Sequence, residues 1–420
     1  MNAIVVFFIS AVLSGGAQAA PLNFDEALAK IISRSTSVQT QQANLNLTEA
    51  NALPSKFIFA PSLSFDAKTY RGGNSAYTGG LDSQIEATSK YNLFHWGADF
   101  ANLSAASADI DMQVLALESS RLSVEDQAIT ALVAQVQALQ EIKINQEIVD
   151  IQTNLYKIAH ERFKSGYLAV QEVNKISVDL ENAIASLSNV QLEEASTRSQ
   201  LENLLGSSDV ELEWPWKMRM KQSETKIENE KWDANALPDW QAAHRHLEAE
   251  EARLHKTQRL LLPSLDANFS YGLYKGLDTI GASPTWTPGW TAALGITFPF
   301  FDNLITYSNM KAQIYNEKIA DIALTQKERD VKAAWDSSRV SFQISLKAAN
   351  GREKTLDTSR QLYQDSLKRF QAGRISANDL VIDQRRLLDS ELFAVQGWAY
   401  AHLQFPKLCH SLGKRLEDCW

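Results

Sequence analysis

Residues 155–166 read LYKIAHERFKSG, and residues 362–373 read LYQDSLKRFQAG, the same framework 207 positions later. Three more blocks recur in the same order, so the repetition extends over most of the chain. Chance similarity would not preserve the order and near-constant spacing of four separated blocks. The sequence therefore consists of one structural unit that is repeated. The further blocks are Leu205-Gly206 with Leu412-Gly413, Leu93-Phe94 with Phe300-Phe301, and Pro61-Ser62-Leu63 with Pro263-Ser264-Leu265.

The first repeated block ends a long stretch without helix breakers. From Ala98 to Ser165 there is no Gly or Pro, and a helix of that length would extend roughly 100 Å at about 1.5 Å per residue. Gly166 breaks the run, and a return helix is predicted to end at the glycine C-cap Leu205-Gly206. Heptad spacing favours coiled-coil packing of these helices, through Leu122, Ile129 and Val136 and then Ile144, Ile151 and Ile158.

The second repeat carries the same pair of helices. The first is predicted from about Thr306 to Gln371, and the second returns through Leu380 and Leu408. Pro406 is expected to kink or end that last helix about one turn before the position where the first repeat stops.

A shorter helix opens each repeat. Asn23 is expected to cap a helix running from Phe24 toward Leu53, with Glu26 completing a capping box. Its counterpart is predicted from Pro238 to about Leu261.

Strict alternation of apolar and polar residues follows each opening helix. It predicts two pairs of strands, over about 62–70 and 84–93 and over about 264–273 and 290–298. Either the apolar face packs on a core, or it meets lipid while the charged face lines a water-filled lumen, and the pattern alone leaves both open. Tyr77, Tyr274, Trp286 and Trp290 near the turns tilt the balance slightly toward a membrane. The charged face carries Asp66, Lys68, Glu86, Lys90 and Asp266.

Four strands cannot close a barrel by themselves, and an open sheet edge is not tolerated in lipid. If the strands span a membrane, several chains must therefore share one barrel. The apolar stretch Ile4–Leu13 is too short for a membrane-spanning helix, which excludes an α-helical membrane protein.

The termini and the middle of the chain divide it into segments. Residues 1–19 read as a signal peptide with the cleavage site Ala17-Gln18-Ala19, although no Lys or Arg precedes the apolar run. The repeats occupy 20–206 and 238–413. Residues 207–237 form a connector that is expected to pack its tryptophans on the helical bundle, and 414–420 form a tail. Export makes a bond between Cys409 and Cys419 feasible, but two free thiols fit the sequence equally well.

Composition and motifs argue against several functions. The net charge of −9 gives no basic stripe for nucleic acid, and two cysteines exclude a disulfide scaffold. Glycine loops for phosphate and a Ser/His/Asp order are not recognisable, so neither an enzyme nor a cofactor is predicted. One helix carries several residues of the types that bind metals, but they do not form a complete set of ligands. A solvent-exposed, charged helix face is therefore favoured over a metal site. These residues are His244, His246, Glu248, Glu250, Glu251 and His255.

The duplicated unit with its two Arg-Phe-x-x-Gly turns resembles the TolC family of outer-membrane efflux and secretion channels. The resemblance covers Leu22 to Gly413 and includes Phe24-Asp25-Glu26-Ala27-Leu28 and Leu262-Pro263-Ser264-Leu265. It implies a mainly helical fold, in which duplicated long helical hairpins build an α-barrel. Three chains would each add four strands to a 12-stranded barrel in outer-membrane lipid. It also implies a passive duct for an efflux pump or a type I secretion system, docked on a periplasmic adaptor and an inner-membrane transporter.

The resemblance assigns roles to residues at the helical tips. Arg162, Gly166, Tyr167, Arg369 and Gly373 would contact the adaptor, although the glycines also suit the chain reversal and the arginines suit helix capping.

A second group would line the periplasmic entrance and comprises Asp379, Asp383, Glu172 and Arg374. Asp379 matches the first acidic position of the family, whereas Ile382 stands at the second and Asp383 points about 100° away. The alternative for both aspartates is an ordinary pairing with Arg385 or Arg386.

Another class of protein fits the same pattern. An exported coiled-coil scaffold would fold its strands into a soluble sheet, and a pore-forming toxin is a weaker option. The apolar strand faces distinguish a channel from a scaffold, because a scaffold must cover these faces with helices. The lumen charges do not identify what is transported.

Overall fold

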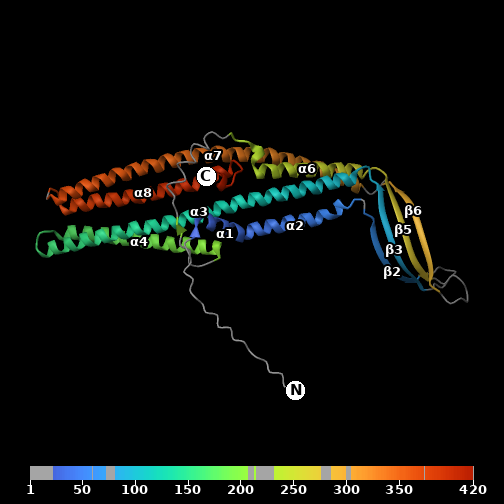
Figure 1. The fold of residues 1–420 in the computed structure, drawn as a ribbon, viewed down its shortest axis with the longest axis horizontal. Coiled ribbons are helices and arrows are strands. Elements are labelled where there is room, and N and C mark those ends of the chain that lie inside the picture. Colours follow the sequence, from blue (N-terminus) through green and yellow to red (C-terminus); the bar gives the residue numbers. More distant parts are fainter. Residues whose placement is uncertain are drawn as a thin grey trace, which may run out of the picture.

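The computed structural model describes residues 22–58, 60–71, 81–206, 212–213, 231–275, 285–298, 304–372 and 374–419. The molecule is elongated, with the sheet at one end and the turns between long helices at the other (Figure 1). The signal peptide and most of the connector, with Trp214 and Trp216, lie outside the described residues.

The first repeat contains the predicted helix, strand pair and helical hairpin in that order. Its long helix begins at the predicted residue, and its return helix ends at Gly206, which has a left-handed backbone with φ +62°. The elements are β1 (Leu22–Asn23), α1 (Phe24–Arg34), α2 (Thr36–Lys56), β2 (Ser62–Arg71), β3 (Leu81–Phe94), α3 (Ala98–Lys164) and α4 (Val170–Leu205).

The second repeat has the same order, which confirms the duplication. The short strand β4 (Leu212–Glu213) precedes it and pairs in parallel with β1. The other elements are η1 (Ala234–Ala236), α6 (Pro238–Arg259), β5 (Ser264–Lys275), β6 (Thr287–Thr297), α7 (Ile305–Gln371), α8 (Ala377–His410) and α9 (Leu416–Cys419).

One prediction about the helices was wrong, and a second was wrong in one of its two alternatives. The opening helix is not continuous, because Ser35 ends α1 and caps α2 by accepting a hydrogen bond from Val38 N at 3.5 Å. Pro406 does not end α8, which continues to His410, while the other alternative, a kink at Pro406, stays a prediction. The residues around Pro406, such as Phe405 and Leu408, are about 1% exposed, so tertiary packing keeps this turn helical against the local preference of proline.

The four long strands form one antiparallel sheet in the order β2-β3-β5-β6. The two repeats therefore meet at the β3–β5 pair, and β2 and β6 are the edges. Asp66 lies opposite Glu86, and Glu86 lies opposite Gly272, so the register carries one polar face across the sheet.

The opposite face of the sheet is apolar and uncovered by the described helices, since the sheet lies beyond their ends in Figure 1. Its large side chains are highly exposed, and five of them are at least 70% exposed: Leu63, Phe65, Trp290, Leu294 and Ile296. The exposure of this face removes the main support for a soluble sheet covered by its own helices.

The helices pack as a layer beside one another. Near the sheet α2 contacts α3, α3 contacts α6, and α6 contacts α7; farther away α4 contacts α3, α3 contacts α8, and α8 contacts α7. Among the described residues, every helix falls short of the combined length and hydropathy that crossing a membrane requires.

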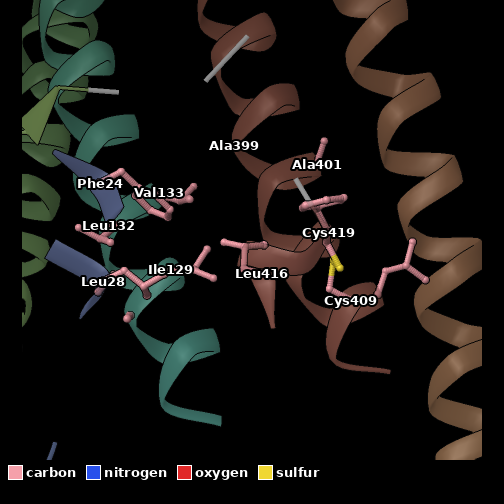
Figure 2. Packing of buried hydrophobic residues seen from close by; sticks show 14 of the residues in the cluster. Phe24, Leu28, Ile129, Leu132, Val133, Ala399, Ala401, Cys409, Leu416 and Cys419 are labelled. Carbon is pink, nitrogen blue, oxygen red and sulfur yellow. A yellow bond between two sulfur atoms is a disulfide. The ribbon is translucent and has the colours of Figure 1, made fainter. Parts of the chain in front are cut away.

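The main core lies midway along the helices, where both repeats end. Phe24 and Leu28 of α1 pack with Leu132 of α3, and Leu416 and Cys419 of α9 close the cluster from the second repeat (Figure 2). A smaller cluster joins α3, α4 and α8 toward the tips and consists of Ile144, Ile148, Ile151, Ala183 and Leu388.

Candidate functional site

The two helical tips share one backbone geometry. At the first tip, Tyr167 N donates to Arg162 O at 2.9 Å and Gly166, with φ +76°, donates to Phe163 O at 2.9 Å. At the second tip, Arg374 N donates to Arg369 O at 2.8 Å. The first set matches a Schellman-type helix end, and the bond at the second tip has the same spacing of five residues between donor and acceptor. Gly373 itself lies outside the described residues.

The tip side chains are free to meet a partner. Tyr167 is 84% exposed, and Arg162 and Arg369 are also exposed. Within the described residues the last carbonyls of α3 are capped by backbone N–H groups, not by Arg162. Helix capping therefore does not account for the arginine side chains, and their contact with an adaptor stays a prediction.

The predicted entrance residues fall into two groups. Glu172 and Arg374 are exposed next to the tips. Asp379 instead caps its own helix: its carboxylate accepts from Ser376 N at 3.2 Å and from Ser376 Oγ at 2.8 Å. An acidic group at a helix N-terminus is also favoured by the helix dipole, so the fold explains this aspartate without a role in the lumen.

Asp383 lies on the seam between α7 and α8. Its carboxylate accepts a hydrogen bond from Ser366 Oγ at 2.5 Å and pairs with Arg386 at 2.7 Å. The side chain is 17% exposed. This is the pairing with Arg386 that the sequence offered as the alternative, while Ile382 beside it is exposed.

The five charged residues predicted for a lumen share the polar face of the sheet. Asp66 pairs loosely with Lys68 at 3.6 Å, and Glu86 accepts from Thr88 Oγ1 at 3.3 Å. Register places Lys90 opposite Ser62, on the same face. Asp266 lies near the base of the sheet, 3.5 Å from His95 Nε2. The five side chains comprise three acidic and two basic residues on one face of the sheet, and their place in a lumen stays a prediction.

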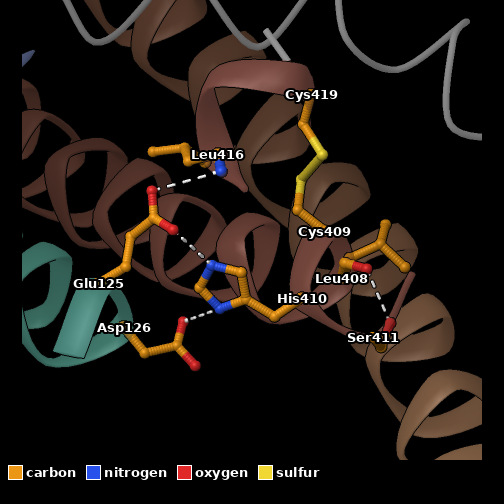
Figure 3. The surroundings of a disulfide bond; sticks show 8 residues. All are labelled: Glu125, Asp126, Leu408, Cys409, His410, Ser411, Leu416 and Cys419. Atoms are coloured by element: carbon orange, nitrogen blue, oxygen red, sulfur yellow. Dashed lines mark hydrogen bonds and ion pairs between the residues drawn. A yellow bond between two sulfur atoms is a disulfide. The ribbon is translucent and has the colours of Figure 1, made fainter. Parts of the chain in front are cut away.

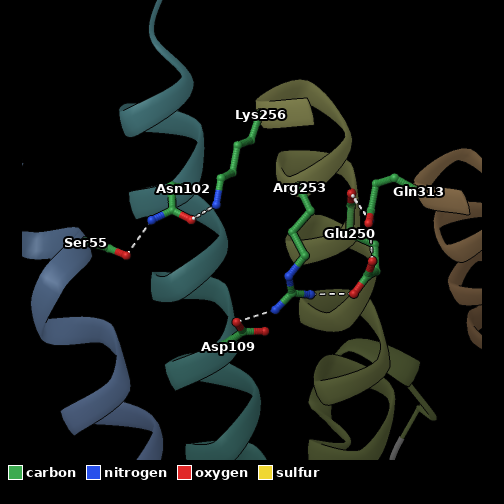
Figure 4. Close-up of polar contacts among 7 residues, drawn as sticks. All are labelled: Ser55, Asn102, Asp109, Glu250, Arg253, Lys256 and Gln313. Carbon is green, nitrogen blue, oxygen red and sulfur yellow. Dashed lines mark hydrogen bonds and ion pairs between the residues drawn. The ribbon is translucent and has the colours of Figure 1, made fainter. Parts of the chain in front are cut away.

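A polar network joins four helices next to the sheet (Figure 4). Asn102 of α3 donates to Ser55 of α2 at 2.6 Å and accepts from Lys256 of α6 at 2.8 Å. The network gives the layer a fixed arrangement at the point where strands become helices.

The same network accounts for one predicted metal-ligand candidate. Arg253 of α6 contacts Asp109 of α3 and also Glu250, which accepts from Gln313 of α7 at 2.5 Å (Figure 4). His244 lies 3.4 Å from Glu248 and stacks on Trp240. The described part of the chain contains no group of His, Cys, Asp and Glu side chains arranged to hold a metal ion.

A clasp at the C-terminus ties the second repeat to α3 of the first. Cys409 and Cys419 form a disulfide with a Cα–Cα distance of 6.3 Å. His410 lies between Glu125, at 3.1 Å, and Asp126, at 3.0 Å (Figure 3). We define this clasp as the disulfide together with His410, Glu125, Asp126 and the paired Arg415 and Glu118.

The clasp holds His410 in its charged form. Burial lowers the pKa of His410, but its contacts with Asp126 and Glu125 outweigh this effect and raise the pKa from 6.5 to about 9. The sequence did not predict this cluster, because no local motif indicates an ion pair between two residues that are 285 positions apart.

Comparison with known proteins agrees with this geometry. The family profile described as "Outer membrane efflux protein" matches residues 27–207 and 235–396, which cover most of both repeats and leave out most of the connector. A sequence comparison with curated proteins found no significant match.

Solved structures share the fold at low sequence identity. A membrane protein from Pseudomonas aeruginosa has a TM-score of 0.76 at 14% identity, covering 94% of this chain and 91% of that one. The outer membrane protein VceC from Vibrio cholerae has a TM-score of 0.76 at 15% identity, covering 93% of this chain and 96% of that one.

A third structure, the CmeC outer membrane channel from Campylobacter jejuni, has a TM-score of 0.75 at 15% identity and covers 98% of this chain and 93% of that one. The resemblance drawn from the repeated motifs is confirmed. Because the family profile covers most of both repeats, the chain belongs to the family of outer membrane efflux proteins, and the solved structures share its fold.

Proposed function

We propose that three copies of the chain close into a passive exit duct across the outer membrane and the periplasm. The family is one of outer-membrane channels and not a class of enzymes. The chain accordingly resides in the outer membrane, with a long periplasmic helical extension. Removal of residues 1–19 on export and packing of the connector on the helices are parts of the same proposal.

The two-faced sheet with two unpaired edges carries the proposal. Its apolar face suits lipid, and its polar face suits water. Within the described residues β2 and β6 each pair on one side only, and lipid does not tolerate free strand edges. Pairing of β6 with β2 of the next copy satisfies both edges and, with four strands from each of three chains, closes the ring.

The helical layer supports the same closure. Its outer members are α4 on one side and α7 on the other (Figure 1), so closing the sheet brings α7 of one copy beside α4 of the next. The tips then form one ring at the periplasmic end. In this arrangement the exposed side chains Arg162, Tyr167 and Arg369 contact an adaptor protein, and Glu172 and Arg374 line the entrance.

The duct itself has no site for an energy-yielding reaction in our proposal, so an inner-membrane transporter drives the export. The partner system is an efflux pump or a secretion system. An exported scaffold is the less favoured candidate, because the apolar sheet face is uncovered by the described helices.

The deciding experiment is the native mass of the full chain extracted in mild detergent from isolated outer membranes. A particle of three chain masses that resists salt and alkali washing, and that conducts ions in a planar bilayer, is the expected result. A monomer recovered from the soluble fraction would overturn the proposal.

A further inference from the structure

A groove along α7 has an apolar floor and a cationic rim. Its floor consists of Trp335, Phe342 and Leu346 of α7 with Leu408 of α8, and its volume is about 530 Å³. The groove lies at the level of the main core, since the four floor residues belong to that cluster.

The rim carries three positive charges and no negative one. Arg339, Lys347 and Lys354 line the groove, and no acidic residue does. All three are exposed, and among the described residues none of them forms an ion pair. Aromatic rings beside carboxylates would suit this surface, because the rings fill the floor and both groups attract the cations.

One segment of this chain has that composition. Residues 207–216 read SSDVELEWPW, with Asp209, Glu211 and Glu213 ahead of Trp214 and Trp216. Its three acidic residues precede the tryptophans, whereas the basic residues Lys217, Arg219 and Lys221 follow them, so the part ahead of Trp214 complements the charge of the groove.

The anchoring of this segment decides which copy of the groove it can reach. Leu212 pairs with Leu22 and Glu213 with Asn23, so β4 is fixed beside the start of α1. Trp216 lies three residues beyond Glu213, and an extended chain covers about 10 Å over that distance.

The groove of the same chain lies too far away. From α1 the layer passes through α3 and α8 before it reaches α7, and α1 and α7 flank the core on opposite sides in Figure 2. Three interhelix steps of about 8–10 Å each place α7 roughly 25–30 Å from α1, more than twice the reach of Trp216.

We infer that the α7 groove receives the segment Trp214-Pro215-Trp216 of the neighbouring copy. The inference rests on the proposed trimer, in which the α1–α4 side of one copy meets α7 of the next. Each connector would then fasten two copies together outside the membrane, by aromatic burial in the groove and by attraction between Glu211 or Glu213 and the rim.

The test is a disulfide cross-link in the full chain in outer membranes. Lys217→Cys with Gln343→Cys places one thiol next to the tryptophans, which stay intact, and one at the groove, which Gln343 lines. The native cysteines are bonded to each other, so the introduced pair supplies the free thiols. The matched control is Lys217→Cys with Ser337→Cys, an exposed position about 160° around α7 from Arg339.

The expected result after mild oxidation is covalent dimer and trimer on a denaturing gel, lost on reduction and at least several-fold weaker in the control. Adding Lys347→Glu should lower the yield several-fold, whereas adding Lys347→Arg should preserve it. A link confined to the monomer, no link, or equal links in the control would overturn the inference. If the native trimer persists in those cases, the proposed function stands, whereas the absence of any trimer overturns both.

Discussion

His410 Nε2 lies 3.1 Å from Glu125 Oε2, although the two residues are separated by 285 positions. Glu125 also accepts a hydrogen bond from Leu416 N at 3.3 Å, just beyond the disulfide loop. One buried carboxylate of the first repeat therefore holds the last turn and the tail of the second.

The first prediction concerns pH. The pKa of His410 rises from 6.5 to about 9 on folding, so its charge stabilises the native state fully below pH 6.5, and this contribution is lost as pH rises through about 9. A shift of this size corresponds to about 3 kcal/mol per chain. We expect the temperature at which the trimer dissociates on heating to fall between pH 6 and pH 10. This fall should be larger in the wild type than in the variant His410→Gln.

A control for this prediction is Arg415→Lys, which keeps a charge beside Glu118 and leaves His410 in place. It should retain the pH dependence of the wild type. The same pH profile for His410→Gln and for the wild type would show that His410 does not carry the effect.

The second prediction concerns the two points where strands become long helices. Gly97 and Leu304 precede α3 and α7 at equivalent positions of the repeats, and both have left-handed backbones, with φ +79° and +66°. Glycine adopts this conformation without cost, whereas leucine is strained by about 1 kcal/mol or more.

Leu304→Gly should therefore raise stability by up to about 1 kcal/mol, measured as the shift in urea-induced unfolding. The reverse change, Gly97→Leu, should destabilise the chain, since a Cβ there would also lie 3.1 Å from Arg259 Nη1. A loss of stability in Leu304→Gly would mean that the leucine side chain contributes more than its backbone strain.

The third prediction tests the lipid-facing side of the sheet. Phe269 lies on the apolar face of β5 and is 51% exposed, while the adjacent Asn268 lies on the polar face. Phe269→Asp should sharply lower recovery of the chain in outer membranes, because a charged side chain on the lipid face destabilises a barrel, by about 2–4 kcal/mol for Arg or Lys at the bilayer midplane and by less for Asp. Asn268→Asp should assemble normally. Equal membrane recovery of both variants would contradict a lipid-facing role.

Regular patterns in the sequence predicted most of the fold. Gly166 and Gly206 mark where the first helical hairpin turns and ends, and strand alternation predicted both faces of the sheet. These signals are local, and the duplication supplied each of them twice. Ser35 was also a local signal, but the polar sequence around it gave no apolar periodicity to show that the helix stops.

The features that sequence missed depend on contacts between distant elements. The clasp at His410 and the network at Arg253 need the rotation of each helix about its axis, and repeat order does not fix that rotation. Asp379 shows the converse, because its spacing from Ser376 forms a local capping box, whereas the family resemblance assigns it to the entrance.

The last prediction concerns the tips. Tyr167 is 84% exposed and its backbone N–H, not its ring, completes the turn, so Tyr167→Ala should leave trimer stability within about 0.5 kcal/mol of the wild type. If the tip binds an adaptor, removing this ring should lower export and recovery of the cross-linked adaptor at least several-fold. Lys175→Ala, a change at an exposed position about one and a half turns into α4, serves as the control. Full export by Tyr167→Ala would show that the adaptor does not use this side chain, and a joint loss of trimer and export would assign it a structural role instead.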